Sequence, residues 1–329
     1  MFNQGFPFFP ILLIVKVVGT ESPSVIGVVA AYRRPQMLVN LLGSLAGATT
    51  LRKVIVVDNG SDEETERAAK QAPVPVLYHR PEGNLGCGGG VARGLKLGLQ
   101  EEGVTHFCML DDDAESRPGA LDILIREMIL AEADVAVPLV LTREGFIGWP
   151  PGLQEAHPWE VIRRPRITPA EYYERCGTGP VPFTWAPWPM MAVSARAVRE
   201  CGCPRDDFWL CAEDLEYSLR ITRRHTGVLV PAATCRHLPP ASSGGDALGG
   251  AHYLRFCLML QNLSYLCTRL AHGRRSIRHL PENYLRFMRT FGVNGTSLRD
   301  AGLALWHGAV RGKPGGVAGA LKERMRDEG

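Results

Sequence analysis

Five short apolar runs mark the first 140 residues, and segments with helical apolar spacing separate them. The runs are Val25–Ala31, Val54–Val57, Val74–Tyr78, Thr105–Leu110 and Val135–Leu139. Strands of almost continuous apolar character are typical of a parallel sheet that helices cover on both faces. The sequence therefore predicts an α/β fold with a Rossmann-like, mostly parallel sheet flanked by helices. In such sheets, ligands bind outside the carboxyl ends of the strands.

The predicted helices lie between these strands, at residues 36–45, 62–71, 91–99 and 118–131. Beyond residue 145 the alternation stops. Residues 145–190 are rich in Pro and Trp, and we expect a long loop region over the sheet there. The remaining expected elements are a strand near Met190–Val193, helices from Ala195 and over 213–223, a short strand at Val228–Val230 and a helical region from Leu254.

The charge of the chain is balanced in total but not along its length. The formal net charge of +3 excludes a histone-like protein and an acidic disordered chain. Residues 250–329, however, hold 13 basic and 5 acidic side chains. No nucleic-acid motif accompanies this charge, so we expect no nucleic-acid partner. Arginines interleaved with apolar side chains suit a helical surface on anionic lipid, and a plain solvated helical face is the alternative.

The N-terminus and the cysteines bear on the compartment. The apolar N-terminal extension, residues 1–22, is interrupted by Pro7 and Pro10 and is too short to span a membrane. It also lacks the basic start and cleavage site of a signal peptide. The nine cysteines form no C-x-x-C pair, which favours reduced thiols in the cytosol. We therefore expect a cytoplasmic protein with three parts: residues 1–22, 23–249 and a basic helical region, 250–329.

Three adjacent carboxylates, Asp111, Asp112 and Asp113, follow the fourth predicted strand. Like charges this close raise each other's pKa and destabilise a fold unless a positive group neutralises them. A hard divalent cation does so, and carboxylate oxygens suit Mg²⁺ or Mn²⁺. Acidic capping of the next helix is the alternative, although one Asp suffices for that. The triplet therefore indicates a metal site.

Three further segments contain candidate functional residues. The glycine-rich stretch 83–90 either lets a backbone approach a phosphate or is an ordinary turn, and it matches neither G-x-G-x-x-G nor the P-loop. Asp214 lies in the first turn of a helix predicted from Glu213, where a carboxylate acts as a base or simply caps the helix. His237 follows a short predicted strand, and a lone histidine is more often structural than a ligand.

Taken in order, these segments resemble family 2 glycosyltransferases with the GT-A fold, from about Val25 to Tyr265. The resemblance rests on VVAAYRRP, VIVVDNGSDE, NLGCGGGVARG, LDDDAE, FWLCAEDLEYSLR and YLRFCLMLQNLSYL. Gln261 stands where the last motif usually has Arg, and Arg93 where many relatives have Asn. The Asp triplet, the aromatic segment from Trp185, Asp214 and His237 are most similar to bacterial rhamnosyl- and galactofuranosyltransferases. The galactofuranosyl branch usually carries adjacent tryptophans, whereas two residues separate Trp185 from Trp188 here.

The resemblance implies a role for each candidate residue. Asp111, Asp113 and His237 would hold Mg²⁺ or Mn²⁺ against the two phosphates of a nucleotide sugar. Asp214 would deprotonate an acceptor hydroxyl, and one base with one in-line displacement implies inversion. The nucleotide-sugar-binding residues would be Tyr32, Arg33, Asp58, Asn84, Gly86, Arg93 and Asp112. The acceptor residues would be Trp185, Trp188, Trp209 and Glu213, although these tryptophans are equally compatible with a place in the core.

The expected function is therefore inverting, metal-dependent transfer of a sugar from a UDP- or dTDP-sugar to a hydroxyl of a glycan or lipid-linked acceptor. The resemblance places residues 23–249 in the catalytic domain of an enzyme of bacterial cell-wall or polysaccharide biosynthesis. With a lipid-linked acceptor, the basic region would hold the enzyme at the inner face of the plasma membrane.

Two other functions fit part of the pattern. A nucleotidyltransferase shares the sheet and the acidic strand end, but it normally has a glycine-rich, lysine-containing loop after the first strand, which residues 31–35 lack. A non-catalytic nucleotide-sugar-binding protein predicts loss of Asp214 or of the triplet, and both are intact.

Overall fold

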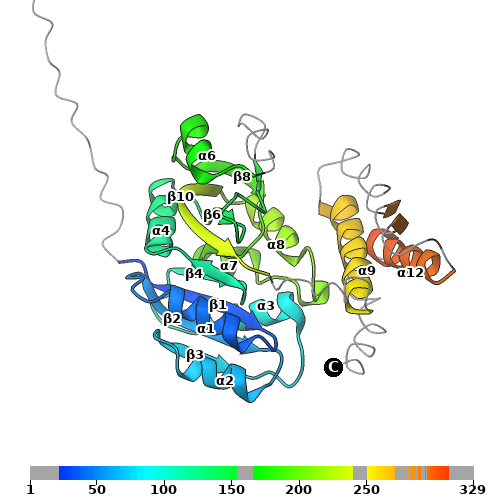
Figure 1. Ribbon diagram of the computed structural model, residues 1–329, viewed down its shortest axis with the longest axis horizontal. Coiled ribbons are helices and arrows are strands. Elements are labelled where there is room, and N and C mark those ends of the chain that lie inside the picture. The colour runs from blue at the N-terminus through cyan, green and yellow to red at the C-terminus, as the bar shows by residue number, and fades with distance from the viewer. Residues whose placement is uncertain are drawn as a thin grey trace, which may run out of the picture.

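The strands of the chain form one twisted sheet. The computed structural model describes residues 22–153, 166–239, 250–270, 281, 284–285, 288–289, 293 and 295–310 (Figure 1). The strands are β1 (Val25–Ala31), β2 (Leu51–Asp58), β3 (Val76–His79), β4 (His106–Leu110), β5 (Ala114–Ser116), β6 (Val135–Leu141), β7 (Gly152–Leu153), β8 (Val181–Trp185), β9 (Met190–Ser194) and β10 (Gly227–His237). Their order is β3-β2-β1-β4-β9-β6-β10-β8-β7, with β5 paired to β10. The pairs among β1–β4 and the β6–β10 pair are parallel, whereas β9 runs antiparallel to both of its neighbours.

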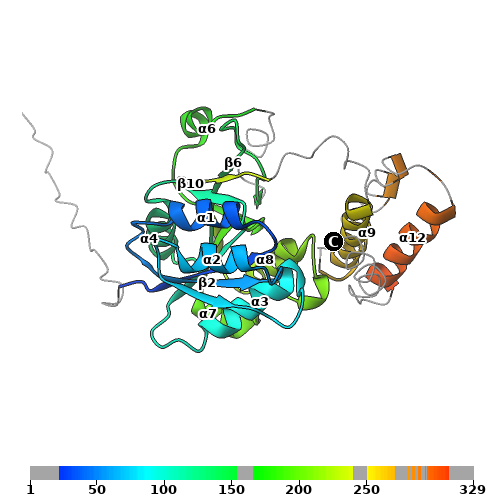
Figure 2. The same ribbon diagram turned by 60° about the horizontal axis from the view of Figure 1, so that its bottom comes forward.

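Helices cover both faces of this sheet, as the apolar strands predict. They are α1 (Pro35–Ser44), α2 (Glu63–Lys70), α3 (Gly86–Gly98), α4 (Ala120–Leu130), α6 (Pro169–Cys176), α7 (Ala195–Cys201) and α8 (Glu213–Thr222). One core cluster joins α3, α7 and α8 to side chains such as Val28. The other joins α1, α2 and α4 to the opposite face through side chains such as Val29. Successive residues of β1 thus point into different cores. Helices lie on both sides of the sheet (Figure 2), which confirms the predicted α/β fold.

The glycine-rich stretch is not a loop, and this expectation is wrong. Helix α3 already begins at Gly86, and its buried glycines face two surfaces: Gly90, Gly94 and Gly98 face the sheet, whereas Gly86 and Gly88 face residues 205–213. A Cβ on Gly94 would lie 2.4 Å from a methyl of Val28, and one on Gly90 would lie 2.7 Å from Cβ of Ala30. Glycine is therefore required in α3 for close packing against the sheet and against residues 205–213, which accounts for the composition without a phosphate-binding turn.

Residues 145–190 are not one long loop either. The described part of this range contains β7, helix α6 and β8, and β8 pairs with β10. Thr168 and Glu171 form a reciprocal capping box at the start of α6, with Pro169 in its first turn. The Pro- and Trp-rich composition of the range favoured a loop, and the capping-box pattern at 168–171 was not recognised from the sequence. The predicted strand at Val228–Val230 is also longer, because β10 continues to His237 and pairs there with β5.

The C-terminal helices pack beside the sheet rather than on it. Helix α9 (Gly250–Tyr265) and helix α12 (Gly295–Leu305) continue as single turns η2 (Leu266–Leu270) and η3 (Trp306–Val310). Both views place α9 and α12 next to each other at one side of the molecule (Figures 1 and 2). Small residues allow the close contact, since a Cβ on Gly308 would meet the carbonyl of Gln261 at 2.1 Å. Residues 1–21 of the N-terminal extension and residues 271–280 and 311–329 of the basic region lie outside the described residues.

No helix in the described ranges has the length and apolar character that crossing a bilayer requires.

Candidate active site

The carboxyl ends of β1, β2 and β4 lie at one edge of the sheet. In the parallel register Ala31 pairs with Asp58, and Val29 pairs with Leu110. The residues that follow each strand are therefore neighbours, as the topology requires. Strand β10 brings a residue from further along the chain to the same edge. It ends at His237, which pairs with Ala114, directly after the Asp triplet.

Asp111, Asp113 and His237 form a cluster of potential metal ligands. One ligand atom from each can be chosen so that all three lie within 4.8 Å of one another. His237 Nε2 lies 2.9 Å from Asp113 Oδ1 and 3.6 Å from Asp111 Oδ2. Two carboxylates and one imidazole fit Mg²⁺ or Mn²⁺ in donor type. The sequence predicted this set, although the three residues span 126 positions.

Trp149 completes one wall of this cluster. Its ring packs edge-on against His237, with the two ring centroids 4.5 Å apart. The side chain is 39% exposed, so it shields the imidazole and still faces solvent. Trp149 was not predicted from the sequence, because nothing local connects it with a histidine 88 residues later.

Arg34 neutralises part of the acidic triplet. Its Nη1 lies 2.9 Å from Asp112 Oδ1 and 3.0 Å from Asp113 Oδ2. Asp112 Oδ2 also accepts a hydrogen bond from the backbone N–H of Tyr32. Asp112 is thus a buried residue that ties the turn after β1 to the turn after β4. Tyr32 and Arg33 of this turn were expected from the sequence, whereas Arg34 was not selected.

The pKa values of the triplet differ because its surroundings differ. Burial, together with its acidic neighbours, raises the pKa of Asp111 to about 7. Burial also acts to raise the pKa of Asp113, but the hydrogen bond from His237 and the charges of His237 and Arg34 hold it below its usual value. For His237, burial opposes protonation, and the two carboxylates nevertheless raise its pKa. Asp113 is therefore held by two close partners, Arg34 and His237, whereas Asp111 has the more distant His237 beside it and a raised pKa, which favours a cation.

Asp214 lies in the first turn of α8, as predicted, with Glu213 before it. Burial raises the pKa of Asp214 to about 6 and that of Glu213 to about 8. At neutral pH, Asp214 is therefore ionised and able to accept a proton, whereas Glu213 is protonated. Asp214 also raises the pKa of Asp111 by charge repulsion, which puts it near the metal-ligand cluster.

The loop after β2 is held by its own residues. Asp58 is fully buried, and its oxygens accept hydrogen bonds from the backbone N–H groups of Gly60, Ser61 and Asp62 and from the Tyr78 hydroxyl. Asn59 joins this loop to the start of α3 by donating to the Gly86 carbonyl and accepting from Leu85 N–H. Asp58 thus shapes the loop, and Asn59, which was not selected from the sequence, fixes it to α3.

The other candidate nucleotide-binding residues lie around the same edge. Asn84 accepts from the N–H of Gly86 and so holds the first turn of α3. Arg93 is exposed and donates to His79, the last residue of β3. Tyr32 is 37% exposed, and the guanidinium of Arg33 lies 5.4 Å from the centre of its ring. Tyr32, Arg33 and Arg93 are therefore available to a ligand outside the strand ends.

The candidate acceptor tryptophans do not share one environment. Trp188 is 3% exposed and belongs to the core cluster with Tyr217. Trp209 is 4% exposed and packs into the cluster of α9. The structure places these two in the core, which is the alternative that the sequence left open. Trp185 is only partly buried, and its indole lies against Gly152 of β7.

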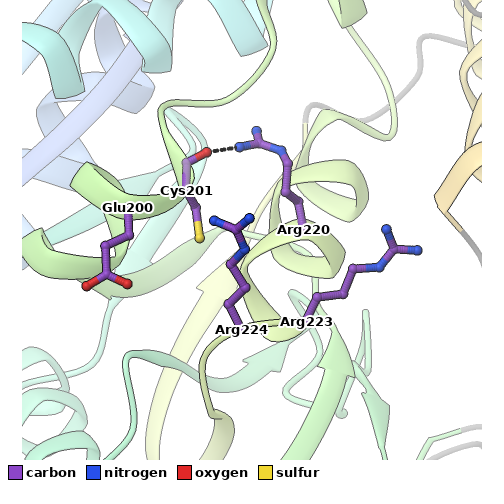
Figure 3. A pocket seen from close by; sticks show the side chains of 5 residues that line it. All are labelled: Glu200, Cys201, Arg220, Arg223 and Arg224. Carbon is purple, nitrogen blue, oxygen red and sulfur yellow. Dashed lines mark hydrogen bonds between the residues drawn. The ribbon is translucent and has the colours of Figure 1, made fainter.

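A pocket of about 340 Å³ opens at the other end of α8 (Figure 3). It is lined by Glu200, Cys201, Arg220, Arg223 and Arg224. Arg220 donates to the Cys201 carbonyl, so this side chain joins α8 to α7. At 1.5 Å per residue, the ten residues of α8 put the pocket roughly 15 Å from the helix end that carries Asp214. The pocket and the strand-end cluster are therefore separate.

Known proteins share this architecture. The sequence model of the family described as Glycosyl transferase family 2 matches residues 27–192, half of the chain. This stretch runs from β1 through the Asp triplet to β9. Among curated protein sequences none matches.

Solved structures share the fold at low sequence identity. S. aureus TarS 1–349 in complex with UDP-GlcNAc is 14% identical, with a TM-score of 0.53 over 86% of this chain and 79% of that one. The mannosyltransferase PcManGT from Pyrobaculum calidifontis, in complex with GDP-Man and Mn²⁺, is 15% identical, with a TM-score of 0.52 over 93% of this chain and 81% of that one. GalNAc-T7 with UDP, GalNAc and Mn²⁺ gives 0.51 at 14% identity, over 80% of this chain, which spans 55% of that protein.

Proposed function

We propose a function for this chain, which belongs to glycosyl transferase family 2. The chain catalyses inverting, metal-dependent transfer of a hexose from a nucleoside-diphosphate sugar to a hydroxyl of a glycan or lipid-linked acceptor. One observation carries the proposal: the buried carboxylate of Asp214 lies close enough to Asp111 and His237 of the metal-ligand cluster for their charges to interact. The metal-ligand cluster can therefore bind the diphosphate of the donor, and Asp214 can accept the proton of the acceptor hydroxyl.

The donor binds outside the strand ends of β1, β2 and β4. Asp111, Asp113 and His237 would hold Mg²⁺ or Mn²⁺, whose charge stabilises the departing diphosphate. Nδ1 of His237 is buried and has no hydrogen-bond partner among the described residues. The hydrogen bonding of this ring is therefore directed to the carboxylates through Nε2. Asn59 and Asp58 keep the β2 loop in place for the nucleoside, and Tyr32, Arg33, Asn84, Gly86 and Arg93 complete the donor surface.

Asp214 accepts the proton of the acceptor hydroxyl while that oxygen attacks the anomeric carbon. The bond from this carbon to the diphosphate oxygen breaks on the opposite face, so the configuration inverts. A retaining double displacement needs a second ionised carboxylate as nucleophile. Asp111 and Asp113 are assigned to the metal, and Glu213, the residue before Asp214, has its pKa raised to about 8 by burial and by Asp214, so it is protonated at neutral pH. This supports a single displacement.

The donor and acceptor are proposed from the similarity of the sequence motifs. UDP-galactofuranose and dTDP-rhamnose are the leading donors, and the family resemblance favours a role in bacterial cell-wall or polysaccharide synthesis. On the acceptor side, the partly exposed Trp185 is proposed to stack on a sugar, and Glu213 borders the base. Trp188 and Trp209 are buried in the core, so neither is proposed to stack on the acceptor.

The basic region 250–329 is proposed to hold the enzyme on anionic lipid at the cytoplasmic face of the plasma membrane. Exposed apolar side chains on its described helices, including Leu303, Trp306 and Val310, support this. Flotation with liposomes tests it: the protein should float with vesicles containing anionic lipid and not with neutral ones. Equal recovery from both would contradict the lipid role.

A panel of nucleotide sugars tests the transferase function. With Mn²⁺ present, one donor at a hundredfold excess over its dissociation constant should stabilise the protein by about 2.7 kcal/mol. The same donor should then support release of its nucleoside diphosphate with an acceptor. Activity only with a nucleoside triphosphate and a sugar 1-phosphate would identify a nucleotidyltransferase, and binding without any transfer would identify a sensor.

A further inference from the structure

A strained segment precedes the proposed base. Trp209, Cys211 and Ala212 all have positive φ, at 53°, 69° and 63°. Trp209 combines this with a ψ of −59°, and Ala212 is left-handed as the residue before α8. None of these residues is glycine, so each conformation is unfavourable in isolation. Strain of this kind persists only where surrounding contacts enforce it.

Asn262 of α9 supplies such contacts. Its side-chain Nδ2 shares its two N–H groups among the carbonyls of Phe208 at 3.0 Å, Leu210 at 3.1 Å and Cys211 at 2.7 Å. The residue is fully buried. Because three carbonyl oxygens surround this nitrogen, only the NH₂ end of the amide can point toward them. One side chain thus holds three peptide groups of the strained segment.

The start of α3 holds the same segment from the other side. Gly88 N–H donates to the Trp209 carbonyl, and a Cβ on Gly86 would lie 2.3 Å from that oxygen. Residues 208–212 are therefore fixed between α3, which borders the donor edge, and α9. Asp214 follows two residues later, so the position of its carboxylate depends on where this segment lies.

We propose that Asn262 is a positioning residue: its amide clamps the strained segment 208–212 and so sets the place of Asp214 at the head of α8. The proposal rests on the role given to Asp214 in the proposed function. It assigns a task to α9, which lies outside the matched family region and contributes nothing to the metal-ligand cluster.

Asn262→Asp tests the clamp, because it keeps the shape of the side chain but replaces the donor with acceptors that repel the three carbonyls. Ser264→Ala is the matched control, since Ser264 is equally buried on α9 and donates only to the Leu260 carbonyl within its own helix. Amide hydrogen exchange of residues 208–216 should be at least tenfold faster in Asn262→Asp, with residues 25–31 unchanged. Exchange in Ser264→Ala should match the native protein.

Transfer from the donor found in the nucleotide-sugar panel gives the second readout. Asn262→Asp should lower kcat at least thirtyfold and leave the donor KM within threefold, because the metal-ligand cluster is untouched. Adding Ala212→Gly should restore part of the lost kcat, since glycine adopts positive φ without strain. A purely structural residue would lower donor binding and kcat together and would show no such rescue.

Unchanged exchange over 208–216 would overturn the clamp, and faster exchange with native kcat would overturn the positioning role. If Asn262→Asp does not fold, Asn262→Ser, which keeps one donor, replaces it. Its exchange rates over 208–216 and its kcat should then lie between those expected for Asn262→Asp and those of the native protein. If the native protein transfers no sugar from any donor, the proposed function fails, while the exchange rates still decide whether Asn262 clamps the segment.

Discussion

Arg34 Nη1 and Asp112 Oδ1 lie 2.9 Å apart, and the same nitrogen is 3.0 Å from Asp113 Oδ2. This contact joins two turns that are 78 residues apart in the sequence. Both carboxylates are 8% exposed, so the guanidinium compensates charge that water does not reach. The acidic strand end is thus stabilised in part by the protein itself, and Asp111 is left as the carboxylate that most needs a cation.

Arg34→Gln should therefore destabilise the protein. Removing the guanidinium leaves the buried Asp112 carboxylate without its cationic partner and Asp113 with His237 alone, and breaking a buried pair costs about 3 kcal/mol. Urea unfolding measures the change, and Mn²⁺ should recover part of the loss. Arg52→Gln is the control, because Arg52 is 40% exposed in its pair with Glu101 and such pairs contribute less than about 1 kcal/mol. Equal losses in the two variants would contradict the assigned role of Arg34.

His237→Gln tests the metal-ligand cluster. Glutamine can still donate a hydrogen bond to Asp113, but it lacks the imidazole nitrogen. We expect the affinity for Mn²⁺ to fall at least tenfold, and Mn²⁺-dependent binding of the nucleoside diphosphate to fall with it. Titration calorimetry measures both, and Asp113→Ala should abolish the Mn²⁺ effect. Nucleotide affinity that is the same in EDTA and in Mn²⁺ would refute the metal assignment.

The buried carboxylate of Asp214 predicts a pH-dependent stability. Burial raises its pKa from 3.8 to about 6 in the folded protein. Folding thus favours the neutral form of Asp214. Its contribution to the free energy of unfolding is complete below pH 4 and is lost as pH rises through 6. Asp214→Asn stays neutral and should gain about 2 kcal/mol over the native protein between pH 4 and pH 8 in EDTA. Unfolding free energies that run parallel across this range would refute the shift.

Helix α3 offers a test of packing. Gly94→Ala places a methyl 2.4 Å from Val28 Cγ1 and should destabilise the protein by about 1–3 kcal/mol. Gly83→Ala should change stability by less than about 0.5 kcal/mol, because it lies outside the helix and its new methyl would meet no described atom within 4 Å beyond its chain neighbours. Thermal unfolding compares the two. A tolerated alanine at position 94 would mean that α3 does not depend on glycine for its approach to the sheet.

Local patterns were enough to predict the sheet and its edge. Apolar runs located β1, β2, β4 and β6, so Asp58, Asp111 and Asp113 could be assigned to strand ends from the sequence alone. Asp214 was predictable because carboxylates are favoured in the first turn of a helix. These inferences need only the residues on either side of each site.

The features that escaped prediction depend on contacts between distant segments. Arg34 and Trp149 matter through the residues they touch after folding, and neither has a local signature. The glycines of α3 favoured a loop because their role lies in contacts with distant segments, with Val28 and Ala30 of the sheet and with Trp209. Likewise, only the packed structure shows that Trp188 and Trp209 are buried, since stacking and core tryptophans look alike in sequence.

The central claim is that Asp214 is the base of a metal-dependent transfer. Asp214→Asn tests it most directly, because the amide keeps the shape and cannot accept the proton. The rate of sugar transfer should fall by about 10²–10⁴-fold, while calorimetry shows native affinity for the donor with Mn²⁺. Transfer at the native rate by Asp214→Asn, with donor binding intact, would contradict the account.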